Sequence, residues 1–452
     1  MKLVDMDFPV FSHARSGAST RADYESSLAT ACVGILAAGL LALTLLWHIP
    51  MMLWDHLDLV PLYRAWQEGA LSDSVFWDTH GGHMHSAAYA VLLLTTAVSG
   101  GQPWLDCAVS WVLLILYATI VLRLASAAVA TGEMRRRWML GVAFLALFPG
   151  HLANLQWGWQ VAIFLCLLGV AITIACLSAT KFSWWHNAAA LAAAVLAYLS
   201  FATSIALIPT AILLIALRRD WSPVQKIGFV APWLVLGMLV LLNHASSVQA
   251  ASAPQLLHYT LNFLGAGVLR FATDLAPWLA FIGVVTGLHA FVVARRVQHS
   301  LCWLGFFLFA IISAGLTALG RVEPFGVDHA FVTRYVSFSS LFWLGWLGLM
   351  AIASRIEGDA TNRWRMPLGA TVMVFAAANA LHMIKQAATV AEETRTIAAQ
   401  VRKTWPQVDD VLLRSIYFEE SALAGERLEV LRAWSFPPFD KADTGLPARA
   451  RQ

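Results

Sequence analysis

One stretch decides the fold of this chain: residues 27–58 read SLATACVGILAAGLLALTLLWHIPMMLWDHLD. From Ser27 to Leu53 it contains no Asp, Glu, Lys or Arg. An α-helix of that length would measure roughly 40 Å, whereas the hydrocarbon core of a bilayer is about 30 Å thick. The stretch therefore predicts a membrane helix that tilts or projects, and that carries the acidic residues after it into the far interface.

The polar end of this stretch, Trp54-Asp55-His56-Leu57-Asp58, holds two carboxylates three residues apart. If a helix continues through them, both lie close together on one helical face. Ionisable residues at the end of an apolar span face water or line a cavity walled by protein. Asp55 and Asp58 are therefore candidate catalytic residues, either as a general base or as ligands of a metal ion.

The composition is that of a membrane protein. Hydrophobic residues make up 59% of the chain and charged residues only 13%, whereas soluble domains carry about 25% charged residues. Further apolar segments follow one another after residue 84, so we expect an all-α, polytopic transmembrane bundle of about 10–13 membrane helices, with membrane lipids as partners. The net charge of +3 is too small to indicate nucleic acid as a partner.

Basic residues orient the bundle. Arg15 and Arg21 precede the first span, and the later basic loops share one side if the spans alternate from residue 138 onward. The residues in those loops are Arg135, Arg136, Arg137, Lys181, Arg218, Arg219, Arg295, Arg296, Arg355, Arg363 and Arg365. The positive-inside rule makes that side cytoplasmic. The least costly way to keep this alternation is a re-entrant or shallow segment 84–99, and segment 256–272 is expected along the outer interface.

Three regions follow from this pattern. Residues 1–26 form a polar, cytoplasmic N-terminal segment, and residues 27–384 form the transmembrane bundle. A polar outer loop at 54–83 belongs to the bundle and includes a short amphipathic helix around Pro61 to Gly69. Residues 385–452 carry many charges of both signs and are expected to be an extracytoplasmic helical tail, which is too short to bury a large core of its own.

A second polar segment on the expected outer side is Asn154-Leu155-Gln156-Trp157-Gly158-Trp159-Gln160. Indole faces pack against the C–H face of a sugar, while amides hydrogen-bond to its hydroxyls. We therefore interpret Asn154, Gln156, Trp157, Trp159 and Gln160 as candidate sugar- or acceptor-binding residues. The alternative is an aromatic belt at the membrane interface, which Trp populates routinely.

A third polar segment runs from Gly320 to Tyr335 and contains two arginines around a turn bounded by Gly and Pro. Arg334 lies in the first turn of the next apolar span, where free N–H groups and the helix dipole also favour an anion. Arg321, Arg334 and Tyr335 are therefore candidates for binding a phosphate or diphosphate. The alternative is that the arginines pair with Glu323 and Asp328 as loop scaffolding.

The outer loop also carries a histidine cluster, His80, His83 and His85. These side chains could bind zinc, shuttle a proton or hydrogen-bond to a substrate. Their spacing matches no common zinc-enzyme motif, so we include them as candidate sugar- or acceptor-binding residues. The sequence requires no cofactor and leaves a divalent metal ion open.

Taken together, these features resemble the GT-C class of integral membrane glycosyltransferases. The resemblance rests on an acidic pair after the first span, a polar outer loop, short helices with arginine-marked inner loops, and the segments Asn154–Gln160 and Gly320–Tyr335. It implies a GT-C-like fold in a bacterial inner membrane and a polyprenyl-phosphate-linked sugar as donor. It also implies a lipid or glycan acceptor, an active site on the outer face, Asp55 or Asp58 as base, and Arg321 with Arg334 on the donor phosphate.

Two other classes of function remain open. A lipid-linked sugar translocase or other transporter would need charged or polar residues midway through several spans, and these spans are nearly free of them. A membrane acyltransferase would use a histidine such as His244 or His289 as its base. Transfer with release of polyprenyl phosphate would distinguish the glycosyltransferase from both.

Overall fold

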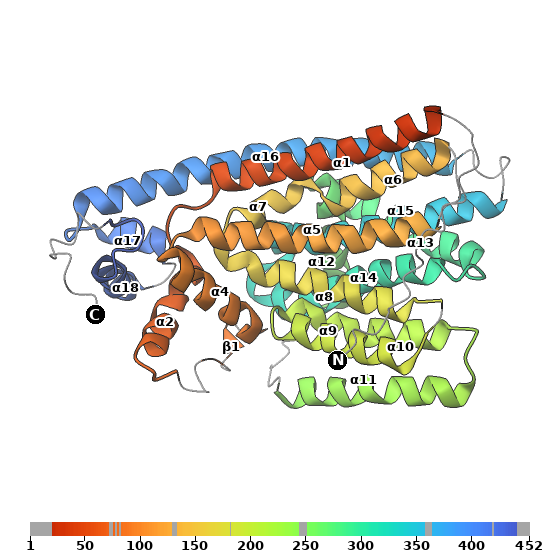
Figure 1. The fold of residues 1–452 in the computed structure, drawn as a ribbon, viewed down its shortest axis with the longest axis horizontal. Helices are drawn as coiled ribbons and strands as arrows, with labels where there is room; N and C mark the ends of the chain where they lie inside the picture. The colour runs from red at the N-terminus through yellow and green to blue at the C-terminus, as the bar shows by residue number, and fades with distance from the viewer. Residues whose placement is uncertain are drawn as a thin grey trace.

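Helices make up almost all of the computed structural model of the chain (Figure 1). It describes residues 20–71, 76, 79–80, 83–128, 133–180, 182–243, 251–357, 364–417 and 420–440. Within those residues the β structure is one antiparallel pairing of two-residue strands, β1 (Thr79–His80) with β2 (His83–Met84). The expected helical architecture is therefore confirmed for this part of the chain. The expected N-terminal segment, residues 1–26, lies almost wholly outside it.

Nine helical segments in the described ranges are long and apolar enough to cross a membrane. They comprise α1 (Thr20–Trp47), α5 (Pro103–Ala128), α6 (Glu133–Ala146) with α7 (Leu152–Leu155), α8 (Val161–Leu177), α11 (Pro223–Asn243), α13 (Ala276–Ala294), α14 (Ser300–Phe325), α15 (Val336–Glu357) and α16 (Arg365–Thr404). The shorter helices α9 (Trp184–Tyr198) and α10 (Leu207–Leu217) pack beside α8 and α14. This is the architecture of a multi-pass membrane protein.

The helix connections gather at the two ends of the bundle (Figure 1). We call one the pocket end; it holds segments 48–58, 149–160, 199–206 and 326–335. Short 3₁₀ helices build these segments: η1 (Trp54–Asp58), η2 (Pro149–His151), η3 (Gly158–Gln160), η4 (Ala202–Ala206), η5 (Val327–Phe331) and η6 (Thr333–Tyr335). We call the opposite end, with segments 218–222 and 295–299, the arginine end.

Helix α4 (Ser86–Ser99) stays at the pocket end. Just before its first residue, the ring of His85 stacks on that of Trp159 with centroids 5.6 Å apart. Just after its last residue, Gly101 has a φ of +77°, and a Cβ there would lie 2.4 Å from the ring of Phe436 in the C-terminal region. Both ends of α4 therefore lie on the same side, as the alternation of the basic loops requires.

Helix α12 (Ala253–Leu269) also begins and ends at the pocket end. The hydroxyl of Tyr259 lies 3.1 Å from Nδ1 of His329, and Arg270, just past the helix, donates to Oε1 of Gln386 at 3.0 Å. The segment does not cross the bundle, in line with expectation. Its second half is nevertheless buried against α13, α14, α15 and α16, and not laid along the surface, because Gly265 and Gly267 admit the neighbouring backbones.

Helix α16 continues far beyond the bundle, on its outside (Figure 1). The predicted boundary between the transmembrane bundle and the C-terminal tail, between residues 384 and 385, is not a break in the structure, because α16 runs through it. The physical reason is that no Gly or Pro occurs from residue 370 to residue 404. The C-terminal region is therefore attached to the bundle by a continuous helix.

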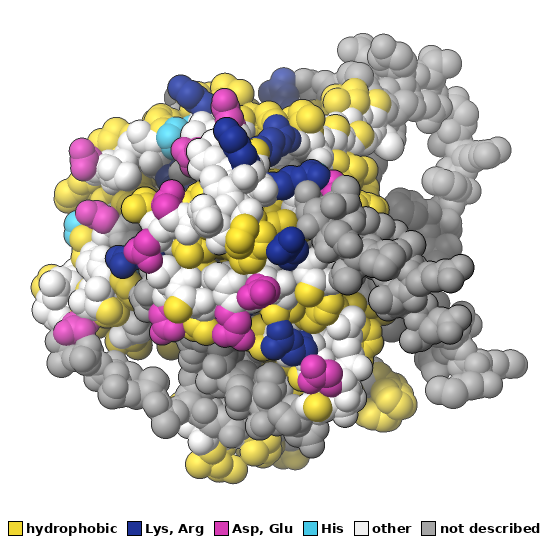
Figure 2. Space-filling model, turned by 90° about the vertical axis from the view of Figure 1, so that its left-hand side faces the viewer, with side chains coloured by type: hydrophobic (Ala, Val, Ile, Leu, Met, Phe, Trp, Pro, Cys, Tyr) yellow, Lys and Arg dark blue, Asp and Glu magenta, His cyan; other side chains and the backbone are white. Residues whose placement is uncertain are grey.

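The pocket end is covered by a layer that we call the cap, made of α2 (Leu59–Gln67), α4, α17 (Asp410–Ile416) and α18 (Ser421–Ala433). These helices share a second hydrophobic core, separate from that of the bundle, which includes Leu57, Leu62, Leu92, Val401 and Leu428. The tail is thus too small for a core of its own and completes one with the outer loop. Figure 2 shows acidic and basic side chains interspersed over this end of the molecule.

Candidate functional site

A cavity of about 360 Å³ lies at the pocket end, between the end of α1, the segment before α8, the start of α15 and the middle of α16. The residues that line it are Ile49, Trp54, Asp55, Ala153, Asn154, Gln156, Trp157, Gln160, Val332, Thr333, Arg334, Gln386, Ala387 and Val390. Parts of the three polar segments singled out in the sequence therefore meet in one space. We call it the pocket-end cavity.

Asp55 reaches this cavity from the turn that ends the first span. Trp54, just before it, has a φ of +56°, a left-handed conformation that costs a non-glycine residue about 1–3 kcal/mol and is found mostly at functional sites. The turn is held by the Trp54 indole, which donates to the carbonyl of Ser415 at 3.1 Å and packs edge-on against Trp157 at 5.2 Å. Tertiary contacts thus hold Asp55 at the wall of the cavity.

Asp58 has a different environment, and it does not line the cavity. Its Oδ1 accepts a hydrogen bond from the Tyr417 hydroxyl at 2.8 Å and forms an ion pair with Arg427, and both groups are mostly buried. The guanidinium of Arg427 lies 4.4 Å from the centre of the Tyr417 ring. Asp58 therefore fastens the cap to the first outer loop. Of the two expected catalytic carboxylates, only Asp55 belongs to the cavity.

The segment before α8 is tied to the start of α15 by buried polar contacts. Nδ2 of Asn154 donates to Oγ of Ser337 at 2.8 Å and to the carbonyl of Arg334 at 3.4 Å. Nδ1 of His151 lies 2.8 Å from the same Ser337 hydroxyl. These contacts fix Arg334 relative to the amide and indole side chains, so Asn154 is a positioning residue as well as part of the wall.

The two indoles of the predicted sugar site separate. Trp157 lines the cavity together with Gln156 and Gln160, whereas Trp159 is buried and is not among the lining residues. Trp159 packs against His85, Tyr89 and His56 with ring centroids 5.6–6.2 Å apart. The aromatic core under the cap therefore takes Trp159 and His85, which removes both from direct contact with a ligand in this cavity.

Three buried polar atoms of the wall find no hydrogen-bond partner among the described residues: Oε1 of Gln156, Nε1 of Trp157 and Nε of Arg334. Buried polar groups are almost always hydrogen-bonded, because an unmade bond costs about 1–3 kcal/mol. One acceptor, one neutral donor and one cationic donor thus surround the same space. Such a set suits a ligand that carries both hydroxyl groups and negative charge.

The two arginines of the predicted phosphate site lie near one another but are not equivalent. Arg334 lines the cavity, while Arg321, on α14, packs over the ring of Phe325 at 5.6 Å and is not a lining residue. Burial and, to a smaller extent, the positive charges of Arg334 and Arg321 together lower the pKa of His329 to about 4. Both arginines therefore contribute positive potential here, and Arg334 alone contributes a guanidinium to the wall.

Tyr335 does not line the cavity. It is buried, and its ring packs against Phe263 at 5.1 Å and near His329 at 5.7 Å. The alternative pairing of Arg334 with Asp328 is absent within the described residues, where Arg334 has no carboxylate within ion-pair distance. The guanidinium of Arg334 lies 5.8 Å from the Tyr335 ring instead. Tyr335 thus supports the arginine from behind.

Two residues on the other side of the cavity, Gln386 and Arg270, were not among the predicted site residues. Gln386 lines the wall from α16, and its Oε1 accepts from Arg270 Nη1 at 3.0 Å. Arg270 is held by Asn379 of α16, whose side-chain oxygen accepts from the Arg270 backbone N–H at 3.1 Å. A third arginine therefore stands one residue behind the wall. The polar Asn379 and Gln386, seven residues apart within an apolar helix, were the available signal.

A buried polar pair lies beneath the Trp157–Gly158–Trp159 segment. Nε2 of His56 is 3.7 Å from Oδ2 of Asp106, and the other carboxylate oxygen accepts from the Thr95 hydroxyl. A Cβ on Gly158 would lie 2.8–2.9 Å from atoms of Asp106 and His56, so only glycine fits. Burial lowers the pKa of His56 to about 3. The imidazole is therefore neutral at physiological pH and supports the segment from below.

The described residues offer no group of three His, Cys, Asp or Glu side chains close enough to hold a metal ion. The side chains of His80 and His83, and residue Asp78, lie outside the described part. The backbones of His80 and His83 pair across the short β-ladder. A metal site at this cluster therefore remains a hypothesis from the sequence.

Comparison with models of known protein families, with curated proteins and with solved structures finds no match to this chain.

Proposed function

We propose that this protein is a membrane glycosyltransferase of the GT-C type, with the pocket-end cavity as its active site. It would transfer a sugar from a polyprenyl-phosphate donor to a hydroxyl group of a lipid or glycan acceptor. The basic loops at the arginine end make that end cytoplasmic under the positive-inside rule, so the reaction would take place on the outer face. A bacterial inner membrane is the location that this proposal implies.

The reaction proposed is a direct displacement at the anomeric carbon. Asp55 accepts the proton of the acceptor hydroxyl as its oxygen forms a bond to the anomeric carbon. The bond from that carbon to the phosphate oxygen breaks, and polyprenyl phosphate leaves with the electron pair. A base contributes about 10²–10⁴-fold to the rate, and fixed charge at the leaving group contributes a similar amount or more. A single displacement inverts the configuration at the anomeric carbon.

The observation that carries this proposal is the composition of one wall. The same cavity of about 360 Å³ is lined by Asp55, Gln156, Trp157 and Arg334, and the last three each carry a buried polar atom that has no hydrogen-bond partner among the described residues. A sugar phosphate needs those three types of group: hydrogen bonds and an apolar face for the ring, a cation for the phosphate, and a carboxylate for the acceptor. The volume lies within the range of about 300–1,000 Å³ typical of ligand sites.

The positive charges at and behind the wall support the proposal that this site stabilises a leaving phosphate. Arg334 would contact the phosphate, and Arg321 would act from a greater distance. Arg270 is near the same wall through Gln386. Charge-assisted hydrogen bonds are roughly twice as strong as neutral ones, and they strengthen further as charge develops on the leaving oxygen.

The experiment is a transfer assay with purified protein in lipid, using a polyprenyl-phosphate sugar labelled on the sugar. Product formation and release of polyprenyl phosphate are measured together for the wild type, Asp55→Asn and Asp58→Asn. We expect Asp55→Asn to lose transfer by about 10²–10⁴-fold and Asp58→Asn to lose little, because only Asp55 lines the cavity.

Two outcomes would overturn the proposal. Full transfer by Asp55→Asn would show that Asp55 is not the base. Movement of intact labelled donor across the bilayer without cleavage would favour a translocase instead. Thermal unfolding of each variant serves as the control, so that a loss of transfer by an unfolded protein is not counted as a loss of catalysis.

A further inference from the structure

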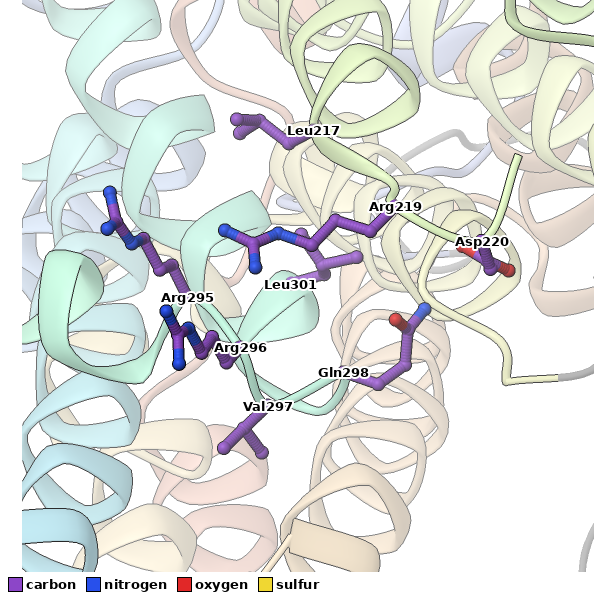
Figure 3. Close-up of a pocket in the computed structure, with 8 residues that line it drawn as sticks. All are labelled: Leu217, Arg219, Asp220, Arg295, Arg296, Val297, Gln298 and Leu301. Atoms are coloured by element: carbon purple, nitrogen blue, oxygen red, sulfur yellow. The ribbon is translucent and has the colours of Figure 1, made fainter. Parts of the chain in front are cut away.

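A second cavity, of about 320 Å³, lies at the arginine end, far from the one proposed as the active site. It is formed by the segment after α10 and by the turn between α13 and α14. Arg219, Arg295 and Arg296 all line it; Figure 3 shows the guanidinium group of Arg219 extending toward the turn that carries Arg295 and Arg296, whereas that of Arg295 points to the upper left and Asp220 lies on the opposite side of Arg219. Three cations from two segments thus share one hollow.

The carboxylate of this cavity is committed elsewhere. Asp220 accepts from Nε and Nη2 of Arg218 at 3.1 and 2.6 Å, which holds its pKa below the usual range. Arg218 is fully buried and also donates to the carbonyls of Leu177 and Ala179. Within the described residues, Arg219, Arg295 and Arg296 have no carboxylate within ion-pair distance. The cavity therefore has an uncompensated positive charge.

An independent feature of the wall points to a ligand. Nε2 of Gln298 is buried and finds no hydrogen-bond partner in the described part of the chain, and this residue lines the cavity. A buried N–H group without an acceptor costs about 1–3 kcal/mol. An anion with several acceptor oxygens would accept hydrogen bonds from this neutral donor and from the three guanidinium groups.

We propose that this cavity binds the phosphate group of an anionic membrane phospholipid. Arginine forks match phosphate oxygens in pairs, and an anion between like charges relieves their repulsion. The site lies where α13 ends and α14 begins, and both are candidate membrane spans, so it stands at the level of lipid headgroups.

The apolar surface beside the cavity favours a lipid over a soluble phosphate. Leu217 and Leu301 line the cavity itself. Exposed leucine and valine side chains continue away from it along α10 and α13, including Leu213, Leu288 and Val292. Acyl chains attached to a phosphate held by the arginines would run along this surface, where they bury apolar area that a free phosphate cannot.

The test uses the full-length protein in vesicles of phosphatidylcholine with increasing phosphatidylglycerol. Thermal unfolding and the amount of phosphatidylglycerol retained after detergent extraction are measured. The double variant Arg295→Gln, Arg296→Gln should weaken lipid retention at least about tenfold, because each charge-assisted contact contributes about 1.5–3 kcal/mol. The matched control is Arg123→Gln. Arg123 is exposed and lies on α5 toward the arginine end, and this variant should retain lipid like the wild type.

The remaining arms decide the source of the phosphate. Equal stabilisation by inorganic phosphate in pure phosphatidylcholine would overturn the assignment to a lipid. Equal retention of phosphatidylglycerol by the double variant and the wild type would overturn the site altogether. Because neither arginine lines the pocket-end cavity, sugar transfer is not the readout, and this inference stands or falls separately from the proposed enzyme activity.

Discussion

The two cavities differ in what surrounds their charges. At the pocket end, one guanidinium is combined with a carboxylate, amides and an indole, and the polar side chains are held by buried contacts. At the arginine end, three exposed guanidinium groups gather with an amide, apolar side chains and the carboxylate of Asp220, which is paired with Arg218. A cluster of charges can hold an anion, whereas a reaction also needs a base and a fixed geometry.

After Asp55→Asn, the largest effect on sugar transfer should come from the arginine of the pocket-end cavity. Arg334→Gln removes a charge-assisted contact of about 1.5–3 kcal/mol, so sugar transfer should fall by about 10- to 150-fold. Arg321→Gln should cost less, because Arg321 is not a lining residue. Rates of labelled-sugar transfer check this. Equal losses from Arg334→Gln and from Arg295→Gln would erase the distinction between the cavities.

The rigid wall of the pocket-end cavity is tested by Gly158→Ala. The added Cβ would meet Asp106 and His56 at 2.8–2.9 Å, and overpacking of this kind costs typically about 1–3 kcal/mol. We expect a lower unfolding temperature and a displaced Trp157. The matched control is Gly425→Ala on α18, where a Cβ meets nothing within 4 Å. That change should be neutral or slightly stabilising, since alanine favours a helix. An unchanged unfolding temperature of Gly158→Ala would mean that the wall shifts easily to accommodate the added Cβ.

The cap is attached to the pocket end through Asp58, which makes a separate prediction. Asp58→Asn removes the charge that pairs with Arg427, and because both side chains keep some exposure we expect a loss of about 1–2 kcal/mol. Protease resistance of residues 405–440 reports it. Asp410→Asn is the control, since its pair with Arg414 is exposed and lies within one helix. A stable cap in both variants would place the attachment elsewhere.

The last prediction concerns the pH dependence of stability at the pocket end. The pKa of His56 is lowered to about 3, so between pH 6.5 and 3 the unfolded chain binds a proton that the folded chain does not. This contribution of His56 to stability is complete above pH 6.5 and falls as the pH falls below it. Thermal unfolding across this range, with His56→Gln for comparison, measures the slope.

Phosphatidylglycerol retention at the arginine end should stay constant from pH 5 to 8, because guanidinium groups do not titrate there. A pH-dependent retention would show that a titrating group takes part in lipid binding together with the guanidinium groups. The same samples serve both measurements, so the comparison is internal to one preparation.

Part of the site could be predicted from the sequence because it consists of short polar segments in an apolar chain. Asp55, Asn154, Gln156, Trp157, Gln160 and Arg334 all line one cavity. Polar residues at the ends of apolar spans must face water or a cavity, so their type and position were informative. Asp58, Trp159, His85, Arg321 and Tyr335 have the same residue types but different surroundings, and sequence neighbours alone do not reveal which of them the cap or the helices cover.

By itself, the sequence determined that the chain is a helical membrane bundle with basic loops on one side, since apolar length and the placement of charge are properties of local segments. Only the tertiary structure decided that Tyr417 and Arg427 take Asp58 into the cap and leave Asp55 at the cavity. The groups that bind Asp58 lie more than 350 residues away in the sequence, and they come close to it only when the cap packs onto the bundle.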